Sequence, residues 1–119
     1  MVGVYTPKRG DLVWLNFSPQ SGHEQAGMRP ALVLSPEKYN IKSGLMLVCP
    51  ITSKVKDYPF EVALEASTIK GSILADQIRN VDWRARKATY IEEAPSHSLN
   101  QTQVLIQLLI GNETMRAIN

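Results

Sequence analysis

Cysteine, histidine and long apolar runs are all scarce in this sequence. Cys49 is the single cysteine among 119 residues, so no disulfide can form within the chain, which suits a reducing compartment. No apolar run approaches the roughly 20 residues that a membrane-spanning helix needs, and the first residues lack the apolar segment of a secretory signal. We therefore expect a cytoplasmic protein with no membrane partner.

The usual ligands of a metal centre are also missing. His23 and His97 are the two histidines, and neither belongs to an HExxH motif or another zinc spacing, while Cys49 has no CxxC partner. The sequence contains no glycine-rich phosphate loop and no GxSxG motif, so neither a P-loop enzyme nor a serine hydrolase has support. We expect no metal and no other cofactor.

The charge balance is close to neutral, with 13 basic and 11 acidic residues giving a net charge of +2. This excess is too small to indicate nucleic-acid binding by itself, so any RNA contact needs a local cluster of cations. The length suits one compact domain over residues 1–119, and the apolar share of 44% is ordinary for a globular protein.

Short apolar runs separated by turn residues predict a mainly β (α+β) fold. Strands are expected where such runs occur, over 11–17, 29–35, 45–51, 60–64 and 71–75, with a further candidate over 86–91. The second run, RPALVLS, is apolar on both faces and is therefore expected at the centre of a sheet. Residues 18–28 are polar, contain two glycines and one proline, and predict a long hairpin loop of the kind that is often functional.

Two segments have helical features. Residues 36–40 fit one helical turn, with Ser35 as its N-cap. Residues 98–110 carry apolar side chains at helical spacing between Pro95 and Gly111. The second half of this segment is apolar nearly all round, which predicts burial on more than one side. The strands and the C-terminal helix together indicate a small barrel, with Trp14 and Trp83 expected in its core.

Polar residues gather where the predicted strands end and loops begin. Taken singly, each fits an ordinary surface residue. They are Glu24, Arg29, Thr52, Ser53, Lys54, Asp76, Gln77, Arg79, Arg84 and Arg86.

Their ordered combination is more specific. The segments EQAGMRPALVLSP (24–36), LVCPITSKVKDYPFEV (47–62) and ADQIRNVDWRAR (75–86), preceded by RGDLVWLNFSP (9–19), resemble the MazF/PemK toxin family in order and spacing. The resemblance covers the chain up to residue 111. It implies an SH3-like barrel of the CcdB/MazF type, an endoribonuclease of a type II toxin–antitoxin system, a homodimer, and an antitoxin partner with an acidic, disordered C-terminal segment.

Cleavage of RNA without a metal uses the ribose 2′-hydroxyl as nucleophile, and the site must stabilise the extra charge on the phosphate. The resemblance aligns Arg29 and Thr52 with the family's two principal catalytic residues. A planar guanidinium can hold two phosphate oxygens, and a hydroxyl can donate to the same phosphate. The alternatives are structural: an ion pair between Arg29 and Glu24, and a strand-end cap by Thr52.

The general base stays open among three residues. Arginine is a poor base because a guanidinium holds its proton, although some family accounts give Arg29 this role. Glu24 is the structural candidate. Asp76 matches a catalytic aspartate of the PemK branch, but Leu74 stands where that branch has an arginine. His23 matches a histidine that stabilises phosphate in the same branch.

Single-stranded RNA is the expected substrate, read through unpaired bases. Candidate base contacts are Phe17, Gln77, Arg79 and Arg86, with Lys54 and Lys56 on phosphates. Two alternatives remain: a poison of DNA gyrase like CcdB, which shares the fold and has no nuclease activity, and an inactive RNA-binding relative.

Overall fold

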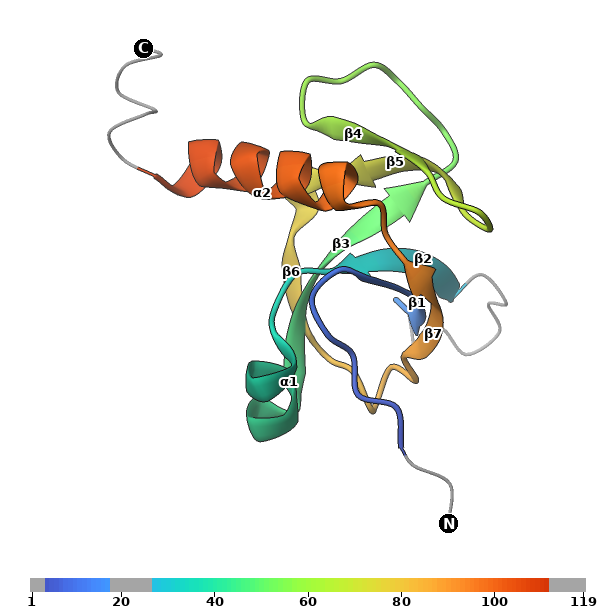
Figure 1. Ribbon diagram of the computed structural model, residues 1–119, viewed down its shortest axis with the longest axis vertical. Coiled ribbons are helices and arrows are strands. Elements are labelled where there is room, and N and C mark those ends of the chain that lie inside the picture. The colour runs from blue at the N-terminus through green and yellow to red at the C-terminus, as the bar shows by residue number, and fades with distance from the viewer. Residues whose placement is uncertain (1–3, 18–26, 112–119) are drawn as a thin grey trace.

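The computed structural model describes residues 4–17 and 27–111. These residues form, in order, β1 (Asp11–Asn16), β2 (Met28–Val33), α1 (Glu37–Ser43), β3 (Leu45–Thr52), β4 (Glu61–Glu65), β5 (Lys70–Leu74), the 3₁₀ turn η1 (Ala75–Gln77), β6 (Arg79–Asp82), β7 (Thr89–Glu93) and α2 (Ser96–Ile110) (Figure 1). The predicted loop over 18–28 lies largely outside the described residues, and so do His23 and Glu24.

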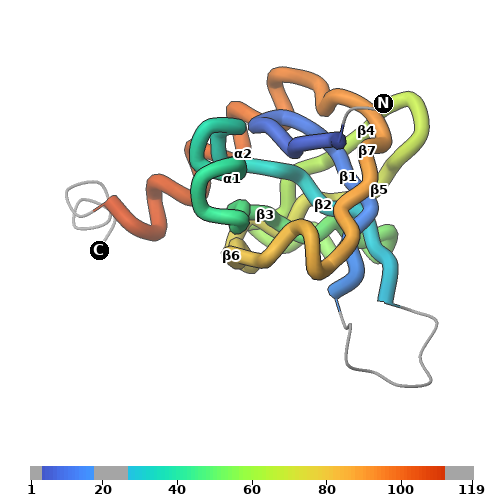
Figure 2. The backbone as a smooth tube through the Cα atoms, turned by 90° about the horizontal axis from the view of Figure 1, so that it is seen from below, coloured from blue at the N-terminus to red at the C-terminus, as the bar shows by residue number. Residues whose placement is uncertain are grey.

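All strand pairs are antiparallel, and their order is β4-β5-β3-β2-β1-β7, with β6 also paired to β3. Strand β3 is shared between two parts of the sheet, because its first residues pair with β6 while Ile51 and Thr52 pair with β5. Figure 2 shows β3, β2, β1 and β7 side by side along one part. The predicted mainly β fold, a small barrel with a C-terminal helix, is confirmed, and the barrel takes the form of a half-barrel of antiparallel strands.

Two buried clusters lie on opposite faces of β1, β2 and β3. Leu12 and Leu32 face the cluster covered by β4, β5 and α2, whereas Val13 and Val33 face the cluster that contains Trp83. This division follows from the alternation of side chains along a strand. Burial of each leucine or valine contributes about 1.5–3 kcal/mol. From Ala31 to Val33 strand β2 is buried on both faces, as its sequence predicted, whereas Met28 and Arg29 at its start are exposed.

Strand β6 was not predicted, because Val81 is its one buried side chain and the run offers no apolar signal. The last predicted strand begins later than expected, at Thr89, since residues 83–88 form a turn in which Ala88 N donates to Trp83 O over 2.9 Å. Lys87 within this turn has a φ of 57°.

The expectation that Ser35 caps α1 is wrong. Pro36 occupies the N-cap position, and the Ser35 hydroxyl instead donates to Asn40 Oδ1 over 2.6 Å. The fully buried Asn40 side chain donates in turn to Pro7 O over 2.8 Å and to Ser35 O over 3.1 Å. Ser35 and Asn40 thus join the N-terminal segment to α1.

The two tryptophans differ. Trp83 is buried as predicted, and its indole N–H donates to Asn40 O over 2.9 Å. The expectation that Trp14 is also in the core is wrong, because 37% of it is exposed. The core cluster on its face of β1 ends at Leu12, and Trp14 lies beyond it, opposite Pro30 and Thr89.

Helix α2 packs against β4 and η1 and buries Thr102 and Ile106, while the rest of the helix extends away from the strands (Figure 1). Its other face is not covered within one chain: Val104 is 59% exposed and Ile110 is 77% exposed. The predicted burial on more than one side therefore needs a further surface. Neither described helix is long and apolar enough to cross a membrane.

Candidate active site

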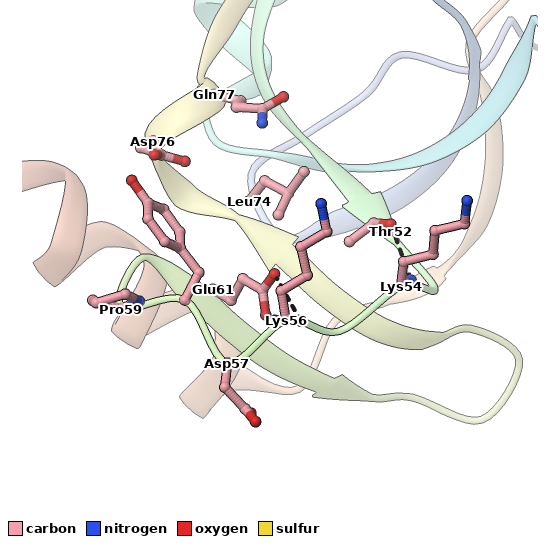
Figure 3. Close-up of a pocket in the computed structure, with 10 residues that line it drawn as sticks. Thr52, Lys54, Lys56, Asp57, Pro59, Glu61, Leu74, Asp76 and Gln77 are labelled. Atoms are coloured by element: carbon pink, nitrogen blue, oxygen red, sulfur yellow. Dashed lines mark hydrogen bonds between the residues drawn. The ribbon is translucent and has the colours of Figure 1, made fainter.

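Two adjoining hollows open at the ends of β2 and β3, and Thr52 and Lys54 line both. The first, of about 580 Å³, is the Asp76 hollow (Figure 3), lined by Thr52, Lys54, Lys56, Asp57, Tyr58, Pro59, Glu61, Leu74, Asp76 and Gln77. The second, of about 450 Å³, is the Arg29 hollow, lined by Arg29, Pro30, Ile51, Thr52, Ser53, Lys54, Thr68, Ile69 and Lys70. Together they form what we call the groove.

The strand register brings Arg29 and Thr52 together. Strands β2 and β3 pair Leu32 with Cys49 and Ala31 with Pro50, and Arg29 and Thr52 each lie two residues beyond this last pair, towards the same end of the sheet. Opposed residues such as Ala31 and Pro50 point to the same side of the sheet, and so do residues two apart along one strand. The two residues that the resemblance selects therefore share one end of the sheet and line one hollow.

The Thr52 hydroxyl accepts a hydrogen bond from the backbone N–H of Lys54 over 3.0 Å. Thr52 thus caps the strand end, which is the structural role that the sequence allowed. Because this contact uses the oxygen as an acceptor, the hydroxyl hydrogen can still be donated to a ligand. The structural and chemical roles of Thr52 are compatible.

The far end of the groove carries Asp76 and Gln77 on η1, across the Leu74 side chain from Thr52 and Lys56 (Figure 3). Asp76, through hydrogen bonding and its negative charge, raises the pKa of the Tyr58 phenol. The phenol therefore keeps its proton at neutral pH. Sequence reasoning missed Tyr58, although its motif, KDYPFEV, was part of the resemblance.

Cys49 lies behind this end of the groove and is fully buried. Burial, with a smaller contribution from the charge of Asp76, raises the pKa of the Cys49 thiol to about 12. Since the thiolate is the nucleophilic form, this cysteine is unsuited to nucleophilic catalysis.

Three predicted base-contacting residues lie together, and none of them lines the two hollows. The Arg79 guanidinium is 5.2 Å from the centre of the Phe17 ring. Arg86 donates through Nη1 to Phe17 O over 2.9 Å and to Asn16 O over 3.2 Å. Arg86 therefore supports the end of β1, next to the arginine–aromatic pair. The proposed RNA contacts of these residues stay predictions.

Several lining residues were not selected from the sequence. Glu61 accepts hydrogen bonds from the Lys56 N–H at 3.1 and 3.3 Å and so holds the loop after β3. Thr68 comes from the hairpin turn between β4 and β5, and Lys70 is the first residue of β5. Within 4–17 and 27–111, no three His, Cys, Asp or Glu residues gather to hold a metal ion.

Residues 8–110 match a protein-family model described as a PemK-like, MazF-like toxin of type II toxin–antitoxin systems. The chain belongs to this family. It is 47% identical over 111 residues to the endoribonuclease toxin MazF of Escherichia coli K12, and the match covers 93% of this chain and all of that protein. It is 35% identical to the E. coli endoribonuclease toxin ChpB over 109 residues, covering 87% and 93% of the two chains. This member of the MazF family is therefore an endoribonuclease toxin.

Solved structures of the family agree with the fold. The crystal structure of MazF from Deinococcus radiodurans superposes with a TM-score of 0.82 at 52% identity, covering 91% of this chain and 99% of that one. A MazE–MazF crystal structure from the same organism gives a TM-score of 0.81 at 47% identity, covering 91% and 98%. The half-barrel and its C-terminal helix are thus those of MazF.

Proposed function

We propose that this toxin cleaves single-stranded RNA, including messenger RNA in the cytoplasm, at the groove, by attack of a ribose 2′-hydroxyl on the adjacent phosphate. The observation that carries the proposal is that Arg29 on β2 and Thr52 on β3 line one hollow together with Lys54. We expect the single domain over residues 1–119 to carry this site. Loss of messenger RNA would stop translation and growth, which is how such an enzyme acts as a toxin.

The reaction needs charge stabilisation more than a strong nucleophile. The 2′-oxygen forms a new bond to phosphorus, the bond to the 5′-oxygen breaks, and the products carry a 2′,3′-cyclic phosphate and a 5′-hydroxyl. Arg29 holds the non-bridging oxygens through two N–H groups, and the Thr52 hydroxyl donates to the same phosphate. Because a guanidinium and a hydroxyl supply these functions, the proposed reaction uses no metal.

Two carboxylates are candidates for the general base that accepts the proton of the ribose 2′-hydroxyl. Asp76 lines the groove together with Tyr58, while Glu24 lies outside the described residues. The pH dependence of cleavage separates them. The variant of the true base, Asp76→Asn or Glu24→Gln, loses the acidic limb of the pH–rate profile, whereas the other variant keeps it. If both variants keep the limb, Arg29 is the remaining candidate.

End-group analysis of digested RNA tests the reaction. Cleavage should survive EDTA, and the 5′ fragments should end in cyclic phosphate. Arg29→Ala should slow cleavage by about 10²–10³ while the fold stays intact. Products with a 5′-phosphate, or dependence on added Mg²⁺, would contradict the mechanism. If the protein neither binds nor cleaves naked RNA, a gyrase poison is favoured. If the protein binds the RNA without cleaving it, an inactive RNA-binding relative is favoured.

We also propose a homodimer that covers the outer face of α2. Val104 and Ile110 are exposed on this helix, and beside them Leu34, Leu47 and Ile78 line an apolar hollow of about 770 Å³. A second copy would supply the burial that the apolar sequence of α2 predicted. Light scattering should give twice the 13.3 kDa of one chain, and Val104→Glu should reduce it towards one chain. A wild-type mass of one chain at micromolar concentration would refute the dimer.

An acidic antitoxin segment is the proposed inhibitor. The crystal structures of MazE–MazF complexes from Deinococcus radiodurans support an antitoxin partner. A negatively charged extended peptide can occupy the positions that Arg29, Lys54 and Lys56 offer to RNA phosphates, with apolar anchors offsetting its ordering entropy. We expect the acidic C-terminal peptide of the antitoxin to displace an uncleavable RNA from the toxin. Simultaneous binding of both without mutual weakening would refute the shared groove.

A further inference from the structure

The wall of the Arg29 hollow opposite β2 is built by the hairpin turn between β4 and β5. Thr68 and Ile69 come from this turn, and Lys70 is the first residue of β5. Lys70 is exposed, and it faces a hollow that also contains Arg29 and Thr52. A cation therefore stands on each side of the proposed position of the reacting phosphate.

Gly71 fixes the position of Lys70 relative to Thr52. Its φ is +150°, and a Cβ atom at this position would lie 2.2 Å from the Thr52 carbonyl oxygen. The backbone of β5 therefore approaches β3 more closely here than any residue with a side chain allows. Since Thr52 is paired with the next residue, Ser72, the turn is in direct register with the end of β3.

Glu92 holds the same turn from the opposite edge of the sheet. Its Oε2 atom accepts hydrogen bonds from Thr68 N at 2.7 Å and Ile69 N at 3.2 Å. Within the turn, Ala66 N donates to Ile69 O over 3.0 Å. Glu92 belongs to β7 and the turn follows β4, and these strands stand at the two ends of the strand order. The Glu92 carboxylate thus connects the β7 edge of the sheet to the turn that follows β4 at the other edge, beside the groove.

We propose that Lys70 binds an RNA phosphate next to the one held by Arg29 and Thr52, and that Glu92 is a positioning residue that holds the turn carrying Lys70. The inference rests on the proposed function. A lysine acts as a point charge, so the contact requires placement of its backbone more than a fixed side-chain geometry. The Gly71 approach and the Glu92 hydrogen bonds supply that placement.

Binding of an uncleavable RNA tests Lys70. The probe is a single-stranded RNA that spans a mapped cleavage site and carries a 2′-O-methyl group on the attacking ribose. Lys70→Ala should weaken binding about fivefold at roughly 0.1 M salt and make the slope of log K against log salt shallower by about 0.7, because one phosphate contact is lost. Lys38→Ala is the matched control, since Lys38 is exposed on α1, at the opposite end of the molecule from β4 and β5 (Figure 1). This control should leave both quantities unchanged.

Two variants of Glu92 separate positioning from charge. Glu92→Gln and Glu92→Ala both remove the negative charge, but only alanine removes the acceptor of the two N–H groups. We expect Glu92→Ala to bind the RNA at least about twofold more weakly than Glu92→Gln. We also expect this difference to vanish when Lys70 is already alanine, because the turn then carries no phosphate ligand.

The outcomes distinguish this inference from the proposed function. One outcome refutes the Lys70 site alone. In it, the wild-type protein cleaves RNA and Arg29→Ala does not, but Lys70→Ala and Lys38→Ala have the same RNA affinity and the same salt slope. The proposed function then stands. If the alanine and glutamine variants of Glu92 bind equally, the positioning role is refuted. If wild-type protein neither binds nor cleaves RNA, the proposed function itself fails.

Discussion

Replacement of Gly71 by alanine tests the contact that joins β5 to the end of β3. The new Cβ would be 2.2 Å from Thr52 O and 3.1 Å from Thr52 C, both backbone atoms, so the strands must separate by about 1 Å. Overpacking of this kind costs about 1–3 kcal/mol. The backbone conformation at φ +150° adds about 1–3 kcal/mol for a residue with a side chain. We therefore expect Gly71→Ala to lower the free energy of unfolding by roughly 2–6 kcal/mol.

Gly44→Ala is the matched control. Gly44 ends α1 with a φ of +74°, and a Cβ atom there would meet nothing within 4 Å. This variant shares the backbone cost and lacks the clash, so it should lose about 1–2 kcal/mol. Urea unfolding followed by the fluorescence of buried Trp83, at one protein concentration, measures both losses. RNA cleavage by the folded fraction should fall in Gly71→Ala only. If Gly71→Ala and Gly44→Ala lost equal stability and had equal activity, the close approach of the Gly71 backbone to Thr52 would be refuted.

Three further predictions concern single side chains. Asn40→Ala should lower the free energy of unfolding by roughly 2–5 kcal/mol in urea, because the buried carbonyls of Pro7 and Ser35 each lose a donor; a loss below about 1 kcal/mol would contradict this. Because the pKa of Cys49 is raised to about 12, its thiol stays protonated, and we expect no alkylation by iodoacetamide at about pH 8 until urea unfolds the chain. Rapid labelling of the native protein would contradict its burial. Thr52→Ser should keep kcat/KM near that of the wild type, whereas Thr52→Val should lower it by about 10²–10³; equal activities would remove the hydroxyl from the mechanism.

The sequence predicted the parts of the fold that local patterns determine. Strand β2 follows from an apolar run on both faces, and its place in the centre follows from the same run. The exposure of Trp14 was not predictable, because it depends on where the cover of one sheet face ends. Strand β6 was missed because pairing with β3, and not its own apolar pattern, makes it a strand.

The candidate site divides in the same way. Arg29 and Thr52 were selected through the family motifs, and the pairing of β2 with β3 then explains why they line one hollow. Tyr58 and Glu92 contribute through partners 18 and 23–24 residues away in the chain, and such contacts exist only after folding. No pattern in the local sequence identifies a carboxylate that accepts hydrogen bonds from the backbone of a turn distant in the chain.

One substitution in the substrate tests the mechanism most directly. A single-stranded RNA containing a mapped cleavage site is prepared with one 2′-deoxyribonucleotide, at the ribose whose 2′-hydroxyl is the proposed nucleophile. Its cleavage is compared with that of the all-ribose strand in the presence of EDTA. We predict that cleavage at the modified position disappears while cleavage at other sites of the same strand continues. Cleavage of the deoxy position at the rate of the all-ribose strand would contradict attack by the 2′-hydroxyl at the Arg29 and Thr52 site.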